Sequence, residues 1–247
     1  CQKGGLECVV AKNPDIVVFQ EIKLGKAGMP QKVSIPGYYC TYRQAARLGY
    51  SGVALFSKVE PKSISFDLGQ ADLDSEARML VADFRTFYVV SVYYPFTGNF
   101  DRVATREKFH QLLLQHVEVL LKDKPVVLVG DFNVAFTNLD VDDHEHSEQL
   151  NRYGKEAPGL SQLERKQLSE FEDLGFSDAF RSLHPTARQY TTFETIRKKG
   201  RNQGWRLNYF LTSEFIEVVN CDILETEYIS DHQPIFLKMV SSWSVQL

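Results

Sequence analysis

The sequence has few cysteines, no excess of basic residues and no long hydrophobic run. Its four cysteines, Cys1, Cys8, Cys40 and Cys221, form no CxxC pair and no regular spacing, so reduced thiols in an intracellular protein are the simplest interpretation. No run approaches the roughly 18 apolar residues of a membrane span. The formal net charge of -4 argues against a generally basic coat for nucleic acid. It still allows local basic patches, because metal-binding carboxylates lower the net charge.

The sequence also lacks internal repeats, low-complexity tracts and linkers rich in proline or glycine. With 247 residues, 43% of them hydrophobic, it is long enough to bury a core and favours a single domain over residues 1–247. The chain begins at Cys1 with no initiator methionine, so the sequence alone leaves open whether a targeting segment precedes it.

Apolar runs of strand length alternate with helical patterns along the chain, which predicts α/β layers: two sheets face to face with helices outside. Apolar spacing predicts an amphipathic helix over 101–122, and the capping box of Ser161 and Glu164 predicts another helix start. The polar stretch 140–159 is predicted to be a loop, whose His144 and His146 could bind a metal but, as exposed histidines, usually do not. The predicted strands are 15–21, 51–57, 87–95, 126–131, 207–212 and 234–240.

The stretch VLVGDFNVAF ends a buried-looking strand on a carboxylate and a carboxamide. Side chains alternate between the faces of a strand, so Asp131 and Asn133 would point the same way if the strand continued. Such a pair could present oxygen ligands or position a nucleophile. The alternative is a strand that leaves the core in an ordinary polar turn.

Polar clusters follow several of the predicted strands. Together they supply carboxylates, an amide, a phenol and an imidazole, a set that suits metal-assisted hydrolysis of a phosphodiester. Carboxylate oxygens are the ligands that Mg²⁺ prefers. If the order of the clusters along the chain is ignored, the same residues could simply be polar residues at the ends of unrelated strands. The clusters contain Gln20, Glu21, Lys23, Tyr93, Asp131, Asn133, Asp231 and His232.

The order of the motifs resembles the exonuclease III/apurinic-apyrimidinic (AP) endonuclease family of the endonuclease/exonuclease/phosphatase superfamily, over nearly the whole chain. The matching stretches, in order, are DIVVFQEIK, GYSGVALFSK, DSEARMLVADF, VYYP, GDFNVAFTNLD, GFSDAFRSLHP, GWRLNYFL and SDHQPI. The resemblance implies a four-layer, DNase I-like α/β sandwich of two mixed sheets flanked by helices. It also implies a Mg²⁺-dependent DNA phosphodiesterase, with Mn²⁺ as a substitute.

The resemblance implies a substrate, a cellular role and a set of site residues. The substrate would be duplex DNA with an abasic site or a 3′ end, bound by a monomer in base excision repair. The enzyme would act in the cytoplasm if bacterial and in the nucleus if eukaryotic, without a membrane. Glu21 would hold the metal with Asp231 nearby, Asp131 and Asn133 would act on the attacking water, and Tyr93 and His232 would contact the phosphate.

Further residues are assigned to DNA binding by the same resemblance. Lys23 and Arg78 would support the catalytic cluster or contact DNA, and Trp205 and Leu207 would line a pocket for a flipped, baseless sugar. The basic stretch IRKKGRNQGWR would reach duplex phosphates, with a solvated loop as the alternative. Its basic residues are Arg197, Lys198, Lys199, Arg201 and Arg206.

The sequence departs from the family pattern at several positions. The family's first strand, which ends in Trp-Asn, is not in the 247 residues, so we expect either a fragment or a rearranged sheet. Phe96 replaces a phosphate-binding Asn, and Asn208 replaces the Asp that partners the catalytic His. Thr192 and Phe193 replace an aromatic pair beside the abasic pocket.

Two hypotheses follow from these matches and departures. One is a working Mg²⁺-dependent nuclease with an altered lesion preference and impaired activity. The other is a degenerate relative that binds nucleic acid or a protein partner without cutting. A phosphatase acting on lipids or inositol phosphates would share the fold, but the DNA-type GWRLNYFL motif disfavours it.

Overall fold

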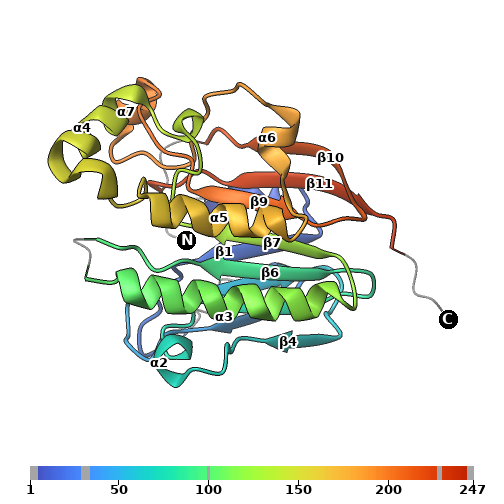
Figure 1. Ribbon diagram of the computed structural model, residues 1–247. Coiled ribbons are helices and arrows are strands. Elements are labelled where there is room, and N and C mark those ends of the chain that lie inside the picture. Colours follow the sequence, from blue (N-terminus) through green and yellow to red (C-terminus); the bar gives the residue numbers. More distant parts are fainter. Residues whose placement is uncertain (1–4, 29–33, 99–100, 227–229, 244–247) are drawn as a thin grey trace.

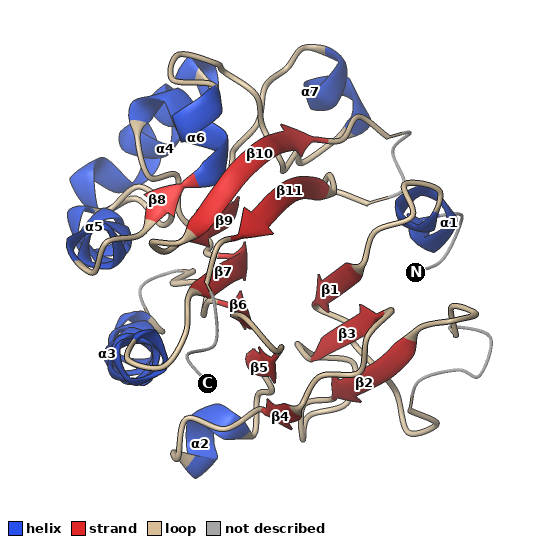
Figure 2. Cartoon of the chain, turned by 90° about the vertical axis from the view of Figure 1, so that its right-hand side faces the viewer, coloured by secondary structure: helices blue, strands red, loops and turns tan. Residues whose placement is uncertain are grey.

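The computed structural model describes residues 5–28, 34–98, 101–226 and 230–243. Two layers of strands lie between layers of helices (Figures 1 and 2). The strands are β1 (Ile16–Gln20), β2 (Tyr39–Arg43), β3 (Val53–Ser57), β4 (Ser63–Ser65), β5 (Met79–Asp83), β6 (Tyr88–Tyr93), β7 (Val126–Asp131), β8 (Ser177–Asp178), β9 (Asn208–Thr212), β10 (Ile216–Ile223) and β11 (Ile235–Ser241).

The helices are mostly short, and two are long enough to cover a sheet. The α-helices are α1 (Gly5–Val10), α2 (Ala71–Asp74), α3 (Val103–Leu121), α4 (Asp143–Tyr153), α5 (Gln162–Asp173), α6 (Ala179–Leu183) and α7 (Ile196–Gly200). Two 3₁₀ turns, η2 (Asn138–Asp140) and η3 (Gly154–Glu156), flank α4. None of the described helices is both long and apolar enough to cross a membrane.

One large mixed sheet and two small antiparallel sheets form the two strand layers. The large sheet has the order β4-β5-β6-β7-β9-β8, with β6 and β7 parallel and the other neighbours antiparallel. The facing layer consists of β1-β3-β2 and of the hairpin β10-β11. The expected sandwich of sheets and helices is therefore confirmed, and the described second layer is built from two antiparallel pieces.

The core between the strand layers follows from side-chain alternation along buried strands. In β3, Val53 and Leu55 pack inward against Leu80 of β5 and Val129 of β7. Phe56 points to the opposite face, in a cluster that also contains residues of α1. A strand buried on both faces reads as a continuous hydrophobic run, which is why VALFS was recognisable in the sequence.

The long helices α3 and α5 cover the outer face of the large sheet. Phe109 and Leu113 of α3 and Phe171 of α5 belong to the same buried cluster as Val126 and Leu128 of β7. Figure 2 shows α3 and α5 on one side of the strands and α1 on the other. The outer helical layer therefore backs the strands that end at the candidate site.

The structure confirms the main elements predicted from sequence. Strands β1, β3, β6, β7, β9 and β11 lie within or beside the predicted ranges, and α3 falls within 101–122. The capping box at the start of α5 is present: the Ser161 hydroxyl accepts from the Glu164 N–H, and the Glu164 carboxylate accepts from the Ser161 N–H. Cys8, Cys40 and Cys221 are free thiols, as expected, and Cys1 lies outside the described residues.

The predicted loop over 140–159 was wrong, because α4 and η3 occupy most of it. The Asp142 side chain caps α4 by accepting from the N–H groups of His144 and Glu145, and Gly154 ends the helix with a positive φ of 68°. This segment has almost no apolar stripe, so the periodicity that reveals most helices is missing.

Candidate active site

Three neighbouring strands bring three predicted site residues side by side. Tyr93 ends β6 and pairs in register with Asp131, which ends β7. On the other side of β7, Asp131 pairs with Asn208, the first residue of β9. The candidate site therefore begins as a row of a phenol, a carboxylate and a carboxamide across the ends of three strands of the large sheet. The segment that joins β6 to α3 lies at this end of the strands, on the left in Figure 1.

A glycine allows this row to form. Gly130 precedes Asp131, has a φ of 150° and is paired with Val92 of β6. A Cβ atom at Gly130 would lie 1.9 Å from the Val92 carbonyl oxygen, a separation that no side chain can tolerate. Glycine is thus required for the close approach of the two strands just before Asp131.

Asp131 and Asn133 are linked to each other by a tight turn. The Asn133 N–H donates to the Asp131 carboxylate at 2.9 Å, and the Asn133 side-chain amide donates to the Tyr94 carbonyl at 2.9 Å. Asn133 has a φ of 50°, so the strand alternation predicted for this pair ends at Asp131. The strand therefore leaves the core in a polar turn, and this turn keeps Asn133 next to the Asp131 carboxylate.

The Asp131 carboxyl is 5% exposed, and its pKa is raised above the ordinary value. Burial is the main cause, since it disfavours the charged form. The nearby His232 and the Asn133 N–H oppose the shift, while repulsion from Glu21 adds to it. A cation bound near Glu21 and Asp131 would relieve that repulsion.

Glu21 reaches this row from the facing strand layer. It follows β1, has a φ of 54°, and accepts a short hydrogen bond from the Tyr93 hydroxyl. Burial and this carboxylate raise the pKa of Tyr93. The Lys23 ammonium lies 3.1 Å from the other Glu21 oxygen, and Gln20 donates to the Ser91 hydroxyl at 2.8 Å, which ties the two layers together.

A charged network lies behind Tyr93, and among its members only Arg78 was singled out in the sequence. Arg78 is 3% exposed, lies 4.5 Å from the centre of the Tyr93 ring and donates to the Tyr50 hydroxyl. Glu76 accepts from both Arg78 and Arg102, and these two arginines outweigh its burial and lower its pKa. Tyr50 and Glu76 lie inside quoted motifs, but only the fold reveals that Arg102 joins them.

His232 lies beside β9, as the motif order predicted. Its Nδ1 atom is 2.9 Å from the Asn208 side-chain oxygen and 3.3 Å from the Thr192 hydroxyl. Asp231 is exposed, and its carboxylate accepts from the Ser230 hydroxyl at 3.1 Å. Within the described part of the chain Asp231 forms no hydrogen bond with Glu21, so the role of Asp231 as a metal ligand stays a prediction.

Trp205 and Leu207 flank the start of β9. Trp205 forms backbone bridges with Thr192 and Val141, and its half-buried ring packs on a small cluster that includes Leu160. Leu207 is half-buried, and its carbonyl accepts from the Phe132 N–H at 2.9 Å. Both residues are thus attached to the site segments that contain Asp131 and His232.

Arg206, between them, is almost completely buried. Its guanidinium donates to Asp140 and Asp178, each at 2.7 Å, and lies 4.4 Å from the centre of the Tyr209 ring. Arg181 also donates to Asp140. Only 1% of Arg206 is exposed, so its charge is neutralised inside the protein.

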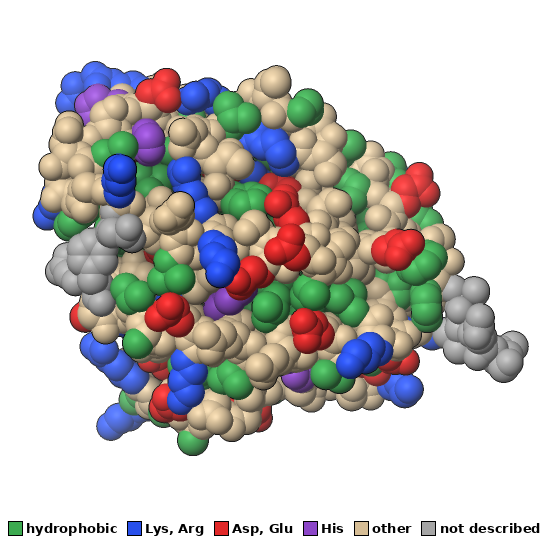
Figure 3. All heavy atoms as spheres, viewed as in Figure 1, with side chains coloured by type: hydrophobic (Ala, Val, Ile, Leu, Met, Phe, Trp, Pro, Cys, Tyr) green, Lys and Arg blue, Asp and Glu red, His purple; other side chains and the backbone are tan. Residues whose placement is uncertain are grey.

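The basic stretch folds as α7 and the turn after it. The Lys198 ammonium lies 2.8 Å from Glu145 and 2.5 Å from Glu194, and the Lys199 ammonium lies 2.9 Å from the Gln233 side-chain oxygen. Arg197 and Arg201, in contrast, are exposed, as are further basic side chains over α4 and α7 at the upper left of Figure 3. The two lysines therefore fasten α7, and the two arginines are directed to solvent.

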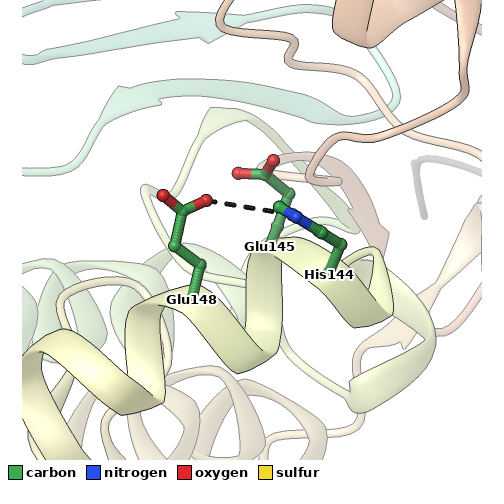
Figure 4. Close-up of side chains that lie close together, drawn as sticks. All are labelled: His144, Glu145 and Glu148. Carbon is green, nitrogen blue, oxygen red and sulfur yellow. Dashed lines mark ion pairs between the residues drawn. The ribbon is translucent and has the colours of Figure 1, made fainter.

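The described residues contain one close group of metal-ligand side chains, and it lies on α4 (Figure 4). One ligand atom from each of His144, Glu145 and Glu148 lies within 4.8 Å of the others. His144 and Glu148 are exposed and form an ion pair at 3.9 Å, whereas the buried Glu145 contacts Lys198 and the Trp205 indole. Since Glu145 already has these partners, the group is best explained as a surface ion pair beside a structural one.

Comparison with known proteins shows the family to which the chain belongs. The profile of the Endonuclease/Exonuclease/phosphatase family matches residues 6–232. Recombination repair protein 1 of Drosophila melanogaster is 35% identical over 240 residues, which are 95% of this chain and 34% of that protein. The DNA repair nuclease APEX1 of Danio rerio is 32% identical over 244 residues, with 96% of this chain and 76% of that protein covered. The chain thus spans about a third of the length of the fly protein and most of the fish one.

Solved structures share the fold. The 3′-5′ exonuclease NExo of Neisseria meningitidis superposes with a TM-score of 0.82 at 26% identity, covering 94% of this chain and 92% of that one. A variant of the 3′ phosphatase NExo bound to a product DNA hairpin gives a TM-score of 0.83 at 25% identity, covering 95% and 93%. The fold and the relatives place the chain among hydrolases of the nuclease type. The chain belongs to the endonuclease/exonuclease/phosphatase family, within its exonuclease III/AP endonuclease group.

Proposed function

We propose that this protein is a divalent-metal-dependent DNA phosphodiesterase that acts at abasic sites or 3′ ends in base excision repair, with impaired activity. The observation that carries the proposal is the position of Asp131, in register with Tyr93 on one side and with Asn208 on the other. The names of its relatives, a DNA repair nuclease and a recombination repair protein, support DNA as the substrate. Such an enzyme works where DNA is, in the bacterial cytoplasm or the eukaryotic nucleus.

Glu21 is the residue best placed to hold Mg²⁺, or Mn²⁺ in its place, with Asp231 as a second candidate. The candidate ligand atoms here are the Glu21 carboxylate and the Tyr93 hydroxyl, oxygens that suit a hard cation. A cation would offset the Glu21–Asp131 repulsion and would replace the Lys23 ammonium, which now lies 3.1 Å from Glu21. When bound, the metal would supply positive charge to a phosphate oxygen.

Asp131 is positioned to take a proton from the attacking water. Its burial keeps that carboxylate basic, and the Asn133 N–H holds it in place. The Asn133 amide nitrogen is occupied by the Tyr94 carbonyl, which leaves its oxygen to hold the water. The Tyr93 phenol donates to Glu21 in this structure, and it would donate to the phosphate once a metal ion takes up the Glu21 carboxylate. Arg78 behind its ring fixes its orientation.

The His232–Asn208 pair is the reason to expect impaired activity. The Asn208 oxygen can only accept, so Nδ1 of His232 donates to it and a neutral ring carries no proton on Nε2. Only the charged ring can also donate to phosphate, and Asn208 supplies no negative charge to favour it. The loss of one such group at an active site commonly costs ~10²–10³ in rate.

The residues assigned to DNA binding fall into two groups: those that would contact DNA and those that support the elements around them. Arg197, Arg201 and the exposed Lys23, whose ammonium also lies 3.1 Å from Glu21, would contact phosphates. Trp205 and Leu207 would line the abasic pocket. The buried charges of Arg78 and Arg206, together with Lys198 and Lys199, hold the elements that carry these groups. We expect a monomer on duplex DNA.

The alternative is a relative that binds nucleic acid or a protein partner without cutting. Phe96 favours it, because this half-exposed ring lies at the end of β6 and offers no hydrogen bond to phosphate.

The deciding experiment is cleavage of a duplex that contains one abasic analogue, with and without Mg²⁺, by the wild type and by Glu21→Ala. The proposal predicts slow, Mg²⁺-dependent cutting that the variant lacks. Binding without any cutting would establish the alternative.

A further inference from the structure

Phe96 lies close to the catalytic row and is half exposed. It follows Tyr93 by three residues, just beyond the end of β6. Its flanking residues Pro95 and Thr97 are buried, while 50% of Phe96 is accessible to solvent. A large apolar ring is therefore presented to solvent beside a site made of polar groups.

The backbone that carries this ring is held from several directions. Arg78 and Asn133 donate to the Tyr94 carbonyl, and the buried Arg106 donates to the Pro95 carbonyl at 3.2 Å. On the other side of Phe96, the Thr97 hydroxyl donates to the buried Glu164 at 2.9 Å. Because its neighbours are fixed, Phe96 can bind a ligand with little loss of conformational freedom.

Phe96 differs from the other exposed aromatic side chains. Phe215 is exposed to a similar extent, 48%, but its ring packs on Trp243 with the centres 5.4 Å apart, at the end of β9 opposite Asn208. Tyr42 contacts other groups and carries a hydroxyl. In the described part of the chain, no ring is stacked on Phe96. Its position and its half-exposed ring, on which no described ring stacks, thus suit contact with a ligand.

A phenyl ring can recognise only a flat or apolar group, since it has no donor or acceptor. Phosphate and sugar hydroxyls gain nothing from it, but the face of a nucleobase does, and such stacking is worth about 1–3 kcal/mol per base. In a continuous duplex both faces of each base are already covered by neighbouring base pairs. A base beside the cleaved phosphate is therefore free to stack only if it is unpaired, as at a frayed or mismatched end.

We propose that Phe96 is a stacking platform for an unpaired base next to the scissile phosphate, and that it directs the enzyme to DNA ends with a mispaired terminal base. This inference rests on the proposed nuclease function and narrows its substrate class. It assigns Phe96 to substrate contact, apart from any role in the chemical step.

The test compares binding to two matched DNA ends by fluorescence anisotropy, without divalent metal. Both are 3′-recessed duplexes with a mismatched terminal pyrimidine, thymine in one and 5,6-dihydrothymine in the other. The saturated base keeps the size and the polar groups of thymine but loses the flat aromatic face. The wild type should bind the thymine end more tightly by at least about 5-fold.

Variants locate this preference on Phe96. Phe96→Leu should reduce the ratio of the two dissociation constants to about 1, and Phe96→Trp should keep it. Phe215→Leu is the matched control and should retain the wild-type ratio. A third duplex with a fully paired end should bind equally well to the wild type and to Phe96→Leu.

Each failure has a separate meaning. A wild-type ratio near 1, or a ratio that Phe96→Leu leaves unchanged, would overturn the stacking proposal. If Mg²⁺-dependent cleavage of an abasic duplex persists in that case, the proposed nuclease function stands without it. If the wild type neither binds nor cuts any of these duplexes, both proposals are overturned.

Discussion

The Nδ1 atom of His232 lies 2.9 Å from the side-chain oxygen of Asn208. Asn208 lies in register with Asp131 on the neighbouring strand, so the two side chains lie on the same face of the sheet. An amide at this place orients the imidazole as a carboxylate would, but it adds no charge. The proposed site thus has the geometry to orient this imidazole, but the pair lacks the negative charge of a carboxylate.

Replacement of Asn208 by Asp should restore that charge. The carboxylate favours the protonated ring, which can then donate to phosphate through Nε2. We expect Mg²⁺-dependent cleavage of an abasic duplex to rise by at least ~10-fold, equivalent to ~1.4 kcal/mol of barrier. NMR of the His232 ring reports its protonation, and Glu21→Ala carried through the same purification excludes a contaminating nuclease. A protonated ring without any gain in cleavage would favour the non-cutting alternative.

The raised pKa of Asp131 predicts a measurable coupling to Glu21. In the metal-free protein, a carboxyl ¹³C titration should show Asp131 losing its charge at a higher pH than an ordinary aspartate, whose pKa is about 3.9. Glu21→Gln removes part of the repulsion and should lower the pKa of Asp131, although burial keeps it above the ordinary value. An unchanged titration in Glu21→Gln would show that the two carboxylates do not interact.

The buried pair of Asp140 and Arg206 should control stability in acid. Burial raises the pKa of Asp140, but Arg206 and Arg181 outweigh burial and leave it lowered. A lowered folded-state pKa contributes stability above the unfolded value of about 3.9, and that stability is lost as the pH falls through the folded value. Asp140→Asn should lose about 3–5 kcal/mol of unfolding free energy at pH 7 and a smaller amount at pH 3. Urea unfolding measures both, and equal losses at the two pH values would contradict this assignment.

The salt dependence of DNA binding should distinguish the exposed arginines from the bonded lysines. Charge reversal of Arg197 and Arg201 should reduce the slope of log affinity against log salt by about 2, because two phosphate contacts are lost. Arg85→Glu is the control, since this exposed arginine lies in the turn between β5 and β6, away from the Tyr93 end. An unchanged slope in the double variant would remove α7 from the DNA-binding surface.

The strands and the two long helices could be predicted because their apolar patterns and the capping box are local. The helix α4 could not, because it has few apolar residues and is held by contacts with distant segments. Glu145, for example, bonds to Lys198, more than 50 positions away in the sequence.

The sequence indicated which residues of the candidate site come together, but it did not indicate which buried groups surround them. Tyr93, Asp131, Asn208 and His232 were expected together, and the strand register and hydrogen bonds place them together. The burial of Arg78 and Arg206 could not be predicted, because an arginine is expected at the surface unless its partners are known. Those partners, Glu76 and Asp140 among them, are recognisable only in the folded chain.

The central claim is that this chain cuts DNA with the help of a metal ion bound at Glu21. The most direct measurement is the rate of cleavage of a duplex with one abasic analogue, in Mg²⁺, in EDTA, and with Glu21→Ala in Mg²⁺. We predict cutting by the wild type in Mg²⁺ alone, and binding to the same duplex under all three conditions. Equal cleavage by Glu21→Ala, or binding by the wild type with no cleavage in Mg²⁺, would contradict it.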